Sequence, residues 1–302
     1  MQFIRNFTSL FSHLAAPGRH RARVAVACPH DESTLEAVDR ALALGIADFV
    51  LVGNPEVIAA RPFMTAYRDR VELVPELDTD TAAARAVALV REGRADVLMK
   101  GLLNTDNLLR AILNKEHGIL SPGSVLTHVT ATQIPGVDRL IMFSDAAVIP
   151  FPTAEQRVAM VAAVAKVCRG LGISSPRIAL IHCSEKTSPK FPVTADYAML
   201  REMCAAGAFG SAVVDGPMDV KTACDPHSGA VKGIDSPIAG MADGLIFPDI
   251  EAGNVFYKTV TCFSHALNAG MLVGASSPVV LPSRSDDTES KLTSLALACA
   301  CA

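Results

Sequence analysis

The sequence has no Trp and only three Tyr among its 302 residues, and its formal net charge is -4. A nucleic-acid-binding protein needs a cationic surface for the phosphate backbone and aromatic rings on which bases can stack. Because both are scarce, nucleic acid is not expected as a partner. The sequence also lacks any run of roughly 18 consecutive apolar residues, so no membrane-spanning helix and no membrane contact are expected.

The eight cysteines include no C-x-x-C pair, which disfavours a zinc site and a disulfide framework. We therefore expect reduced, mostly structural cysteines in a cytoplasmic protein. His30-Asp31-Glu32 fits one half of a zinc deaminase signature, but the P-C-x-x-C half is missing, so no metal is expected. The first twenty residues have no continuous apolar segment of the signal-peptide kind and predict an amphipathic helix.

Aliphatic side chains are abundant: 50% of the residues are hydrophobic and 5% are aromatic. Short β-branched runs alternate with Ala-rich stretches of helical period, which predicts an α/β fold with parallel sheets covered on both faces. The predicted strands are 24–28, 49–53, 71–74, 97–100, 125–134, 140–143, 177–183, 211–215, 244–247 and 272–281. The predicted helices are 33–44, 79–92, 105–114, 154–171, 194–206, 252–269 and a last one from about residue 288.

The alternation of strand and helix breaks at residues 124–147. The strand-like runs 125–134 and 140–143 are joined only by Pro135-Gly136-Val137-Asp138, which is too short for a crossover helix. The two runs are therefore predicted to pair antiparallel as a hairpin. Because single cores stop growing near roughly 250 to 300 residues, this break indicates a boundary between two α/β lobes.

The loops that follow the predicted strands are the expected place for chemistry, because parallel sheets bind ligands at the carboxyl ends of their strands. None of these loops contains G-x-G-x-x-G, G-x-x-x-x-G-K-[ST] or G-x-S-x-G. A standard Rossmann dehydrogenase, a P-loop enzyme and an α/β-hydrolase are thereby disfavoured. The Lys, Arg, Ser, Thr and Gly residues in these loops suit a phosphate that is bound without a P-loop.

Two of the loops hold the densest polar clusters. Lys100-Gly101 followed by Thr105 predicts a cation and a hydroxyl N-cap at a helix start, able to bind phosphate, with an exposed Lys beside a capped helix as the alternative. Ser283-Arg284-x-Asp286-Asp287 combines a hydroxyl, a cation and carboxylates suited to acid-base chemistry. Its alternative is an acidic helix start with Asp286 or Asp287 as N-cap. Asp145 and Glu185 are either site carboxylates or caps, and Arg110 and Lys190 are either anion ligands or solvated.

The sequence resembles the phosphate acetyltransferase and butyryltransferase family, and the butyryltransferase branch more closely, in a set of motifs that occur in the family's order. The resemblance runs from about Arg23 to the C-terminus. The motifs that carry it are Met99-Lys100-Gly101, Leu109-Arg110-Ala111, Leu113-Asn114-Lys115, His128-Val129, Asp145-Ala146-Ala147, Asp215-Gly216-Pro217, Lys232-Gly233-Ile234, Ser236-Pro237, Ile250-Glu251-Ala252-Gly253-Asn254, Tyr257-Lys258, Ser283-Arg284-x-Asp286, Lys291 and Ser294-x-Ala296-Leu297-Ala298.

The resemblance implies a two-lobed α/β fold related to the isocitrate and isopropylmalate dehydrogenases, with an interdomain cleft and a homodimer. The first lobe would comprise residues 1–123 with 271–302, and the second 124–270. The implied reaction converts acyl-CoA and phosphate to acyl phosphate and CoA, without a metal or a covalent acyl-enzyme; CoA is a substrate and no cofactor is needed. Two alternatives stay open: a metal- and nicotinamide-dependent dehydrogenase on the same fold, and a non-catalytic protein that binds CoA or acyl phosphate.

The family's chemistry implies roles for individual residues. Ser283 would hydrogen-bond the CoA thiol, Asp286 would take its proton with Asp287 as the second choice, and Arg284 would stabilise the tetrahedral oxyanion. Lys100 and Arg110 would hold the phosphoryl group. The remaining residues expected to bind substrate are Gly101, Thr105, Ser144, Asp145, Glu185, Lys190 and Asn254. His182-Cys183 replaces the family's small apolar residues, either changing the acyl pocket or forming a packed pair.

Overall fold

The computed structural model describes residues 3–283 and 286–302. The chain forms two compact units. The first unit comprises Phe7–Leu126 with the described part of Asn268–Ala302, and the second comprises Thr127–Leu267 with the described residues before Phe7. The predicted lobe boundaries fall a few residues from these divisions. The N-terminal residues differ from the prediction, because the backbone N–H of Ile4 donates to the carbonyl of Leu171 at 3.0 Å and joins them to the second unit.

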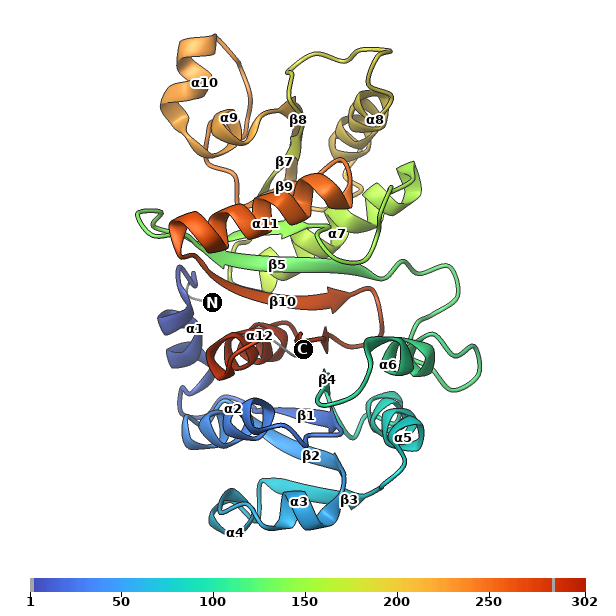
Figure 1. Ribbon diagram of the computed structural model, residues 1–302. Helices are drawn as coiled ribbons and strands as arrows, with labels where there is room; N and C mark the ends of the chain where they lie inside the picture. Colours follow the sequence, from blue (N-terminus) through green and yellow to red (C-terminus); the bar gives the residue numbers. More distant parts are fainter. Residues whose placement is uncertain (1–2, 284–285) are drawn as a thin grey trace. The chain divides into compact units, whose positions relative to one another are not determined.

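In the first unit, six strands form a sheet in the order β3-β2-β1-β4-β11-β10 (Figure 1). All are parallel except β10, which is antiparallel to β11. The strands are β1 (Ala22–Ala27), β2 (Ala47–Gly53), β3 (Val71–Pro75), β4 (Val97–Lys100), β10 (Leu267–Val273) and β11 (Val279–Val280). Phe49, Val50, Leu51 and Val52 have no exposed surface, which confirms the prediction that both faces of this sheet are covered.

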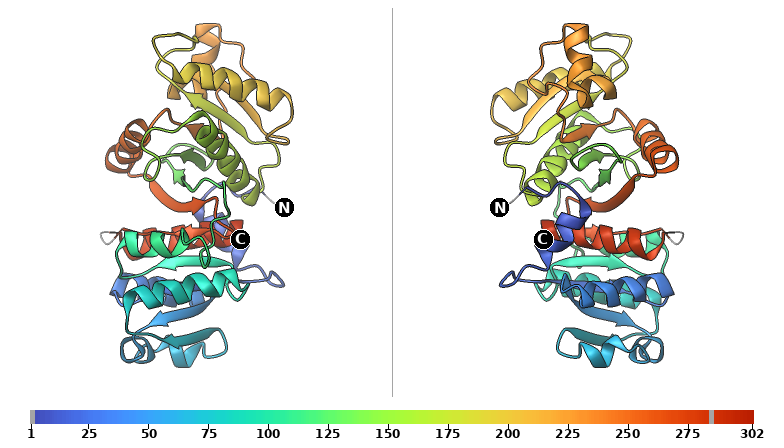
Figure 2. Two further views of the ribbon diagram at one scale, coloured as in Figure 1. Left: turned by 90° about the vertical axis from the view of Figure 1, so that its right-hand side faces the viewer. Right: turned by 90° about the vertical axis from the view of Figure 1, so that its left-hand side faces the viewer.

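The strand order of the first sheet determines which of its two faces each helix covers. The connections β1-α2-β2 and β3-α5-β4 run in opposite directions along the sheet, so right-handed crossovers place α2 and α5 on opposite faces. The terminal helix α12 packs beside α2 and also beside α1, which lies next to it in Figure 2. The helices are α1 (Phe7–Leu14), α2 (Glu32–Ala43), α3 (Pro55–Ala59), α4 (Phe63–Ala66), α5 (Thr79–Arg91), α6 (Thr105–Ile112) and α12 (Thr288–Cys301).

In the second unit, five strands are arranged in the order β5-β6-β9-β7-β8. The pair β5 and β6 is antiparallel, which confirms the predicted hairpin, and β6, β9, β7 and β8 are parallel. The strands are β5 (Thr127–Gln133), β6 (Ile141–Ser144), β7 (Arg177–Ile181), β8 (Val213–Met218) and β9 (Gly244–Ile246). The helices are α7 (Ala154–Gly170), α8 (Val193–Ala205), α9 (Val220–Cys224), α10 (Pro226–Lys232) and α11 (Ile250–Ser264).

Three predicted elements are corrected. The predicted strand 272–281 is a hairpin of β10 and β11, because the chain turns at Gly274, whose φ is 118°. The predicted helix 252–269 ends at Ser264, because His265 adopts a left-handed conformation and the chain continues into β10. The predicted strand 211–215 is shifted along the chain, so that all of Asp215-Gly216-Pro217 lies inside β8.

Candidate active site

In the first unit, the loops that carry the predicted catalytic residues leave the same edge of the sheet. The strands β1, β4 and β11 are parallel neighbours. Their carboxyl ends therefore lie at one edge and lead into the loops of Asp31, Lys100 and Ser283. This is the edge at which parallel α/β sheets bind ligands.

The loop after β4 is held tightly against the loop after β1. The backbone N–H groups of Gly101 and Leu102 donate to the carbonyls of Ala27 and Cys28 at 2.8 and 2.7 Å. A Cβ atom on Gly101 would lie 2.3 Å from the carbonyl oxygen of Cys28, so only glycine permits this approach. Lys100 is only 3% exposed, and its Nζ donates to the carbonyls of Gly101 and Leu103 at 3.3 and 3.2 Å. Its ammonium is thus desolvated at the strand end.

The helix that follows this loop differs from the prediction in its cap. Asn104 occupies the N-cap position of α6, and Thr105, predicted as the cap, is the first residue of the helix. The side chain of Arg110 is exposed and forms no ion pair with any residue that the structure describes. The hydroxyl of Thr105 therefore does not cap α6 as the sequence predicted, and Arg110 on the same helix is exposed to solvent.

In the loop after β11, the two candidate bases Asp286 and Asp287 have different hydrogen-bond partners. The backbone N–H of Ser283 donates to Asp286 Oδ2 at 2.8 Å, and the N–H of Asp286 donates back to the carbonyl of Ser283 at 3.1 Å. Asp287 instead caps α12, accepting from the N–H of Ser290 at 2.8 Å. This hydrogen bond lowers the pKa of Asp287. Asp286 is thus the carboxylate next to Ser283, and Arg284 lies outside the described residues.

A buried ion pair that the sequence did not predict fixes the helix after this loop. Lys291 on α12 has a side chain that is 4% exposed, and its Nζ lies 2.6 Å from Asp31 Oδ1 at the start of α2. The same Nζ donates to Ser33 Oγ at 2.7 Å and Thr34 Oγ1 at 3.0 Å. Burial alone would raise the pKa of Asp31, but the hydrogen bonds from Lys291, Thr34 and Ser33 lower it to about 2. The pair thereby anchors the start of α12 beside the loop of β1.

In the second unit, Asp145 is fully buried directly after β6 and is saturated with hydrogen bonds. Oδ2 accepts from Thr127 Oγ1 at 2.8 Å and the N–H of His128 at 2.9 Å, and Oδ1 accepts from the N–H groups of Ala147 and Val148 at 2.8 Å each. Asp145 is therefore not a helix cap; it ties β5 to the loop after β6. Ser144 is equally buried and bonded to Thr127 at 2.9 Å. Any role for this pair in substrate binding would be indirect, through the loop.

The first turn of α11 packs on that same loop. Asn254 Nδ2 donates to the carbonyl of Ala146 at 3.1 Å. A Cβ atom on Gly253 would lie 2.1 Å from the carbonyl oxygen of Asp145, so the helix can approach this closely only with glycine. Asp249 caps the helix by accepting from the N–H of Ala252 at 2.8 Å. The motif around Asn254 thus joins a helix N-terminus to the Asp145 loop.

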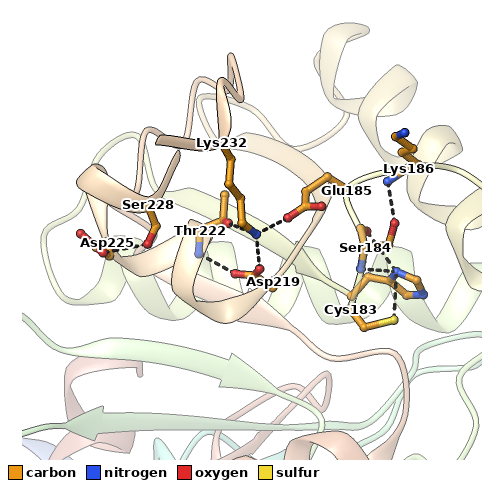
Figure 3. Close-up of polar contacts among 10 residues, drawn as sticks. Cys183, Ser184, Glu185, Lys186, Asp219, Thr222, Asp225, Ser228 and Lys232 are labelled. Carbon is orange, nitrogen blue, oxygen red and sulfur yellow. Dashed lines mark hydrogen bonds and ion pairs between the residues drawn. The ribbon is translucent and has the colours of Figure 1, made fainter. Parts of the chain in front are cut away.

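Glu185, after β7, belongs to an ion-pair cluster rather than capping a helix (Figure 3). Lys232 Nζ lies 2.5 Å from both Glu185 Oε1 and Asp219 Oδ2, and 3.2 Å from Thr222 Oγ1. The hydrogen bonds to the two carboxylates raise the pKa of Lys232. Lys190 is exposed and outside this cluster, with its backbone N–H bonded to Ser188 Oγ at 3.3 Å. In the sequence, Lys232 stands only within the motif Lys232-Gly233-Ile234, and no local pattern indicates its pairing with Glu185.

Of the His182-Cys183 pair, only His182 is packed; Cys183 is exposed, so the predicted packed pair is found for the histidine alone. His182 is 7% exposed and its ring meets that of Phe191 edge to face, with centroids 4.7 Å apart. Its Nδ1 accepts from the N–H of Ser184 at 3.1 Å. Cys183 is exposed beside it, with Sγ 3.9 Å from Nδ1. No group of three or more His, Cys, Asp or Glu side chains suited to a metal ion occurs among residues 3–283 and 286–302.

Comparisons with known proteins agree on one family. A family model described as "Phosphate acetyl/butaryl transferase" matches residues 71–299. The chain is 39% identical to a phosphate butyryltransferase of Clostridium acetobutylicum, covering 98% of this chain and 97% of that protein. It is 35% identical to a phosphate acetyltransferase of Thermotoga maritima, covering 91% and 93%. The crystal structure of a branched-chain phosphotransacylase from Enterococcus faecalis aligns with a TM-score of 0.80 at 31% identity, covering 93% and 98%.

Proposed function

Because the chain belongs to the phosphate acetyl- and butyryltransferase family, we propose that it transfers a short acyl group between coenzyme A and inorganic phosphate. Acyl-CoA and phosphate give acyl phosphate and free CoA, and the reverse reaction regenerates the thioester. The observation that carries this proposal is a family match that extends through both units, with relatives of the same two activities aligned over nearly the whole chain. The dehydrogenase alternative has no comparable support.

The chemistry that we assign to the Ser283 loop concerns the thiol of CoA. A free thiol has a pKa of about 8.5 and is mostly protonated at neutral pH, whereas the thiolate is the nucleophile. In the reverse direction, Ser283 Oγ hydrogen-bonds the thiol, Asp286 accepts its proton, and the thiolate attacks the acyl carbon. The bond from that carbon to the phosphate oxygen then breaks and phosphate leaves. The contact of Asp286 with the backbone of Ser283, at 2.8 Å, supports this assignment.

The negative charges of the reaction are assigned to cations of the first unit. Arg284 stabilises the oxyanion of the tetrahedral intermediate, as preorganised donors do in acyl transfer. Lys100 and Arg110 hold the phosphoryl group. Burial of Lys100 at the end of β4 supports its role, because an ammonium in a poorly solvated loop interacts more strongly with an anion than one in water.

The residues of the second unit are assigned to the CoA and acyl parts of the substrate. Glu185, Lys190 and Asn254 lie in loops and a helix turn beyond the carboxyl ends of β7 and β9, where ligands of α/β sheets bind. Gly101 and Thr105 shape the phosphate loop of the first unit. Ser144 and Asp145 act indirectly by holding the loop that supports Asn254.

Several finer assignments complete the proposal. Higher identity to a butyryltransferase than to an acetyltransferase, 39% against 35%, favours butyryl-CoA as the preferred ester. A cytoplasmic location is consistent with the absence of disulfide bonds among the cysteines that the structure describes. We also assign a homodimer, in which the partner would cover the exposed apolar side chains Val255 and Phe263 of α11, which are 65% and 80% exposed. No helix of the described chain is long and apolar enough to cross a membrane.

The proposal is tested by measuring free thiol released from a series of esters, from acetyl-CoA to hexanoyl-CoA, with and without phosphate. We expect phosphate-dependent release that is fastest with butyryl-CoA. No release from any of these esters would contradict the proposal, and calorimetric CoA binding without turnover would favour a non-catalytic binding protein instead. Ser283→Ala should slow release while leaving the circular dichroism spectrum unchanged.

A further inference from the structure

The second unit contains a cavity of about 370 Å³ at the edge of its sheet where strands begin. Arg139 lies just before β6, Arg177 is the first residue of β7, and Asp243 lies just before β9. Because β6, β9 and β7 are parallel, these three residues share one edge. Ser144 and Glu185, at the carboxyl ends of β6 and β7, lie at the opposite edge of the same sheet. The cavity is therefore separate from the residues of the second unit that are assigned to substrate binding.

The charged side chains that line the cavity are mainly guanidinium groups. Arg5, Arg139 and Arg177 face two carboxylates, Asp138 and Asp243, so one positive charge is left over. Asp138 is only loosely held, with oxygens 3.7 Å from both Arg5 Nη1 and Arg139 Nη1. Asp243 is engaged elsewhere, since its Oδ2 accepts from the backbone N–H of Arg177 at 2.8 Å. Among the described residues, neither carboxylate lies closer than 3.7 Å to a guanidinium nitrogen of Arg139 or Arg177.

Arg139 has hydrogen-bonding capacity that the chain does not use. The residue is 8% exposed, and its Nε donates to the carbonyl of Ala242 at 3.3 Å. Its Nη2 is buried and has no hydrogen-bond partner among the described residues. A buried guanidinium N–H without an acceptor is destabilising. Arg139 itself lines the cavity, so a small rotation of its guanidinium group toward an oxyanion bound there would supply an acceptor.

We propose that this cavity binds a phosphate monoester, with the phosphate group between Arg139 and Arg177 and the organic group against Phe3, Ile173 and Met241. Guanidinium groups pair with phosphate through two parallel hydrogen bonds, and a phosphate has enough oxygens to accept from both arginines and from the hydroxyls of Ser174 and Ser175. The cavity exceeds the size of a phosphate ion and lies within the roughly 300 to 1,000 Å³ of small-molecule sites. The apolar side chains give the remaining volume an apolar lining.

The test is hydrogen-deuterium exchange on the whole protein, with phenyl phosphate, inorganic phosphate and benzoate as probes. Phosphate is also a substrate in the proposed reaction, so binding is read only from peptides that cover 172–177 and 241–243. We expect phenyl phosphate to slow exchange in these peptides at lower concentration than inorganic phosphate, and benzoate to have little effect. Unchanged exchange with both phosphates, or an equal effect of benzoate, would overturn the proposal.

A matched pair of variants locates the ligand. Arg177→Gln should weaken binding about tenfold, the effect of losing one charge-assisted hydrogen bond. Arg201→Gln removes an exposed arginine of the same unit that pairs with Asp215, outside the cavity, and should leave binding unchanged. Both variants should retain thiol-release activity, so failure here differs from failure of the proposed reaction. Equal affinity of Arg177→Gln and the unmodified protein would overturn the proposal.

Discussion

The carboxylate of Asp286 accepts a hydrogen bond from the backbone amide of Ser283 at 2.8 Å, which places an acceptor next to the proposed thiol-binding serine. The neighbouring Asp287 is committed to capping α12. Two adjacent aspartates thus have different structural roles, and the proposed role of base is assigned to Asp286 because its carboxylate contacts the backbone of Ser283.

Asp286→Asn is expected to lower turnover by about 10²- to 10⁴-fold, the usual contribution of general acid-base catalysis. Asp287→Asn should change turnover little, because Asn is as good an N-cap as Asp. Steady-state thiol release from butyryl-CoA measures both. If Asp287→Asn abolished turnover and Asp286→Asn did not, the assignment of the base would be wrong by one residue.

Lys291→Met should reduce the free energy of unfolding by about 2 to 3 kcal/mol, because it leaves the partly buried carboxylate of Asp31 without its cation. Arg40→Gln is the matched control. It breaks the pair of Arg40 with Glu289, which is 2.8 Å long with both side chains 43% exposed, and should cost less than about 1 kcal/mol. Urea unfolding monitored by circular dichroism compares the two. Equal effects of the two variants would contradict the importance given to the buried pair.

The same ion pair predicts a dependence of stability on pH. The pKa of Asp31 is about 2 in the folded protein, below its ordinary value of 3.8, so the unfolded chain binds the proton more readily. The stabilisation is therefore fully present above about pH 4 and is lost as the pH falls toward about 2. Lys291→Met should lose less stability than the unmodified protein over that interval. Parallel stability curves for the two proteins would show that Lys291 does not lower this pKa.

Gly253→Ala should destabilise the second unit by about 1 to 3 kcal/mol, the usual cost of overpacking. Its new Cβ would lie 2.1 Å from the carbonyl of Asp145, so the loop or the helix must move. Gly229→Ala, on α10, is the control, because nothing lies within 4 Å of its added Cβ and Ala favours helix. Thermal unfolding distinguishes them, and a stabilising Gly253→Ala would show that the contact is not as close as described.

The order of strands and helices could be predicted wherever a local pattern carries the information. The short Pro135–Asp138 connection correctly predicted an antiparallel hairpin, since too few residues are present for a crossover. The turn at Gly274 was not predicted, because the segments before and after it are both hydrophobic and read as one continuous strand. The extension of β8 through Pro217 was missed because Gly-Pro normally indicates a turn.

The sequence predicts which residue types belong to the candidate site, but not which of these residues form hydrogen bonds or ion pairs with one another. Local sequence left Asp286 and Asp287 equivalent, and only the backbone conformation separates the cap from the acceptor. The pair of Lys291 with Asp31 joins positions 260 residues apart in the chain, so no spacing rule predicts it. Similarly, Glu185 meets Lys232 only because the loop after β7 and the end of α10 lie together.

Direct acyl transfer between CoA and phosphate is tested most directly by measuring both products in one reaction. Butyryl-CoA and phosphate are incubated with the protein, free thiol is assayed, and butyryl phosphate is quantified by phosphorus NMR. We predict one equivalent of butyryl phosphate for each equivalent of thiol, and no thiol release when phosphate is omitted. Thiol release that is independent of phosphate and yields no butyryl phosphate would show a thioester hydrolase and contradict the account.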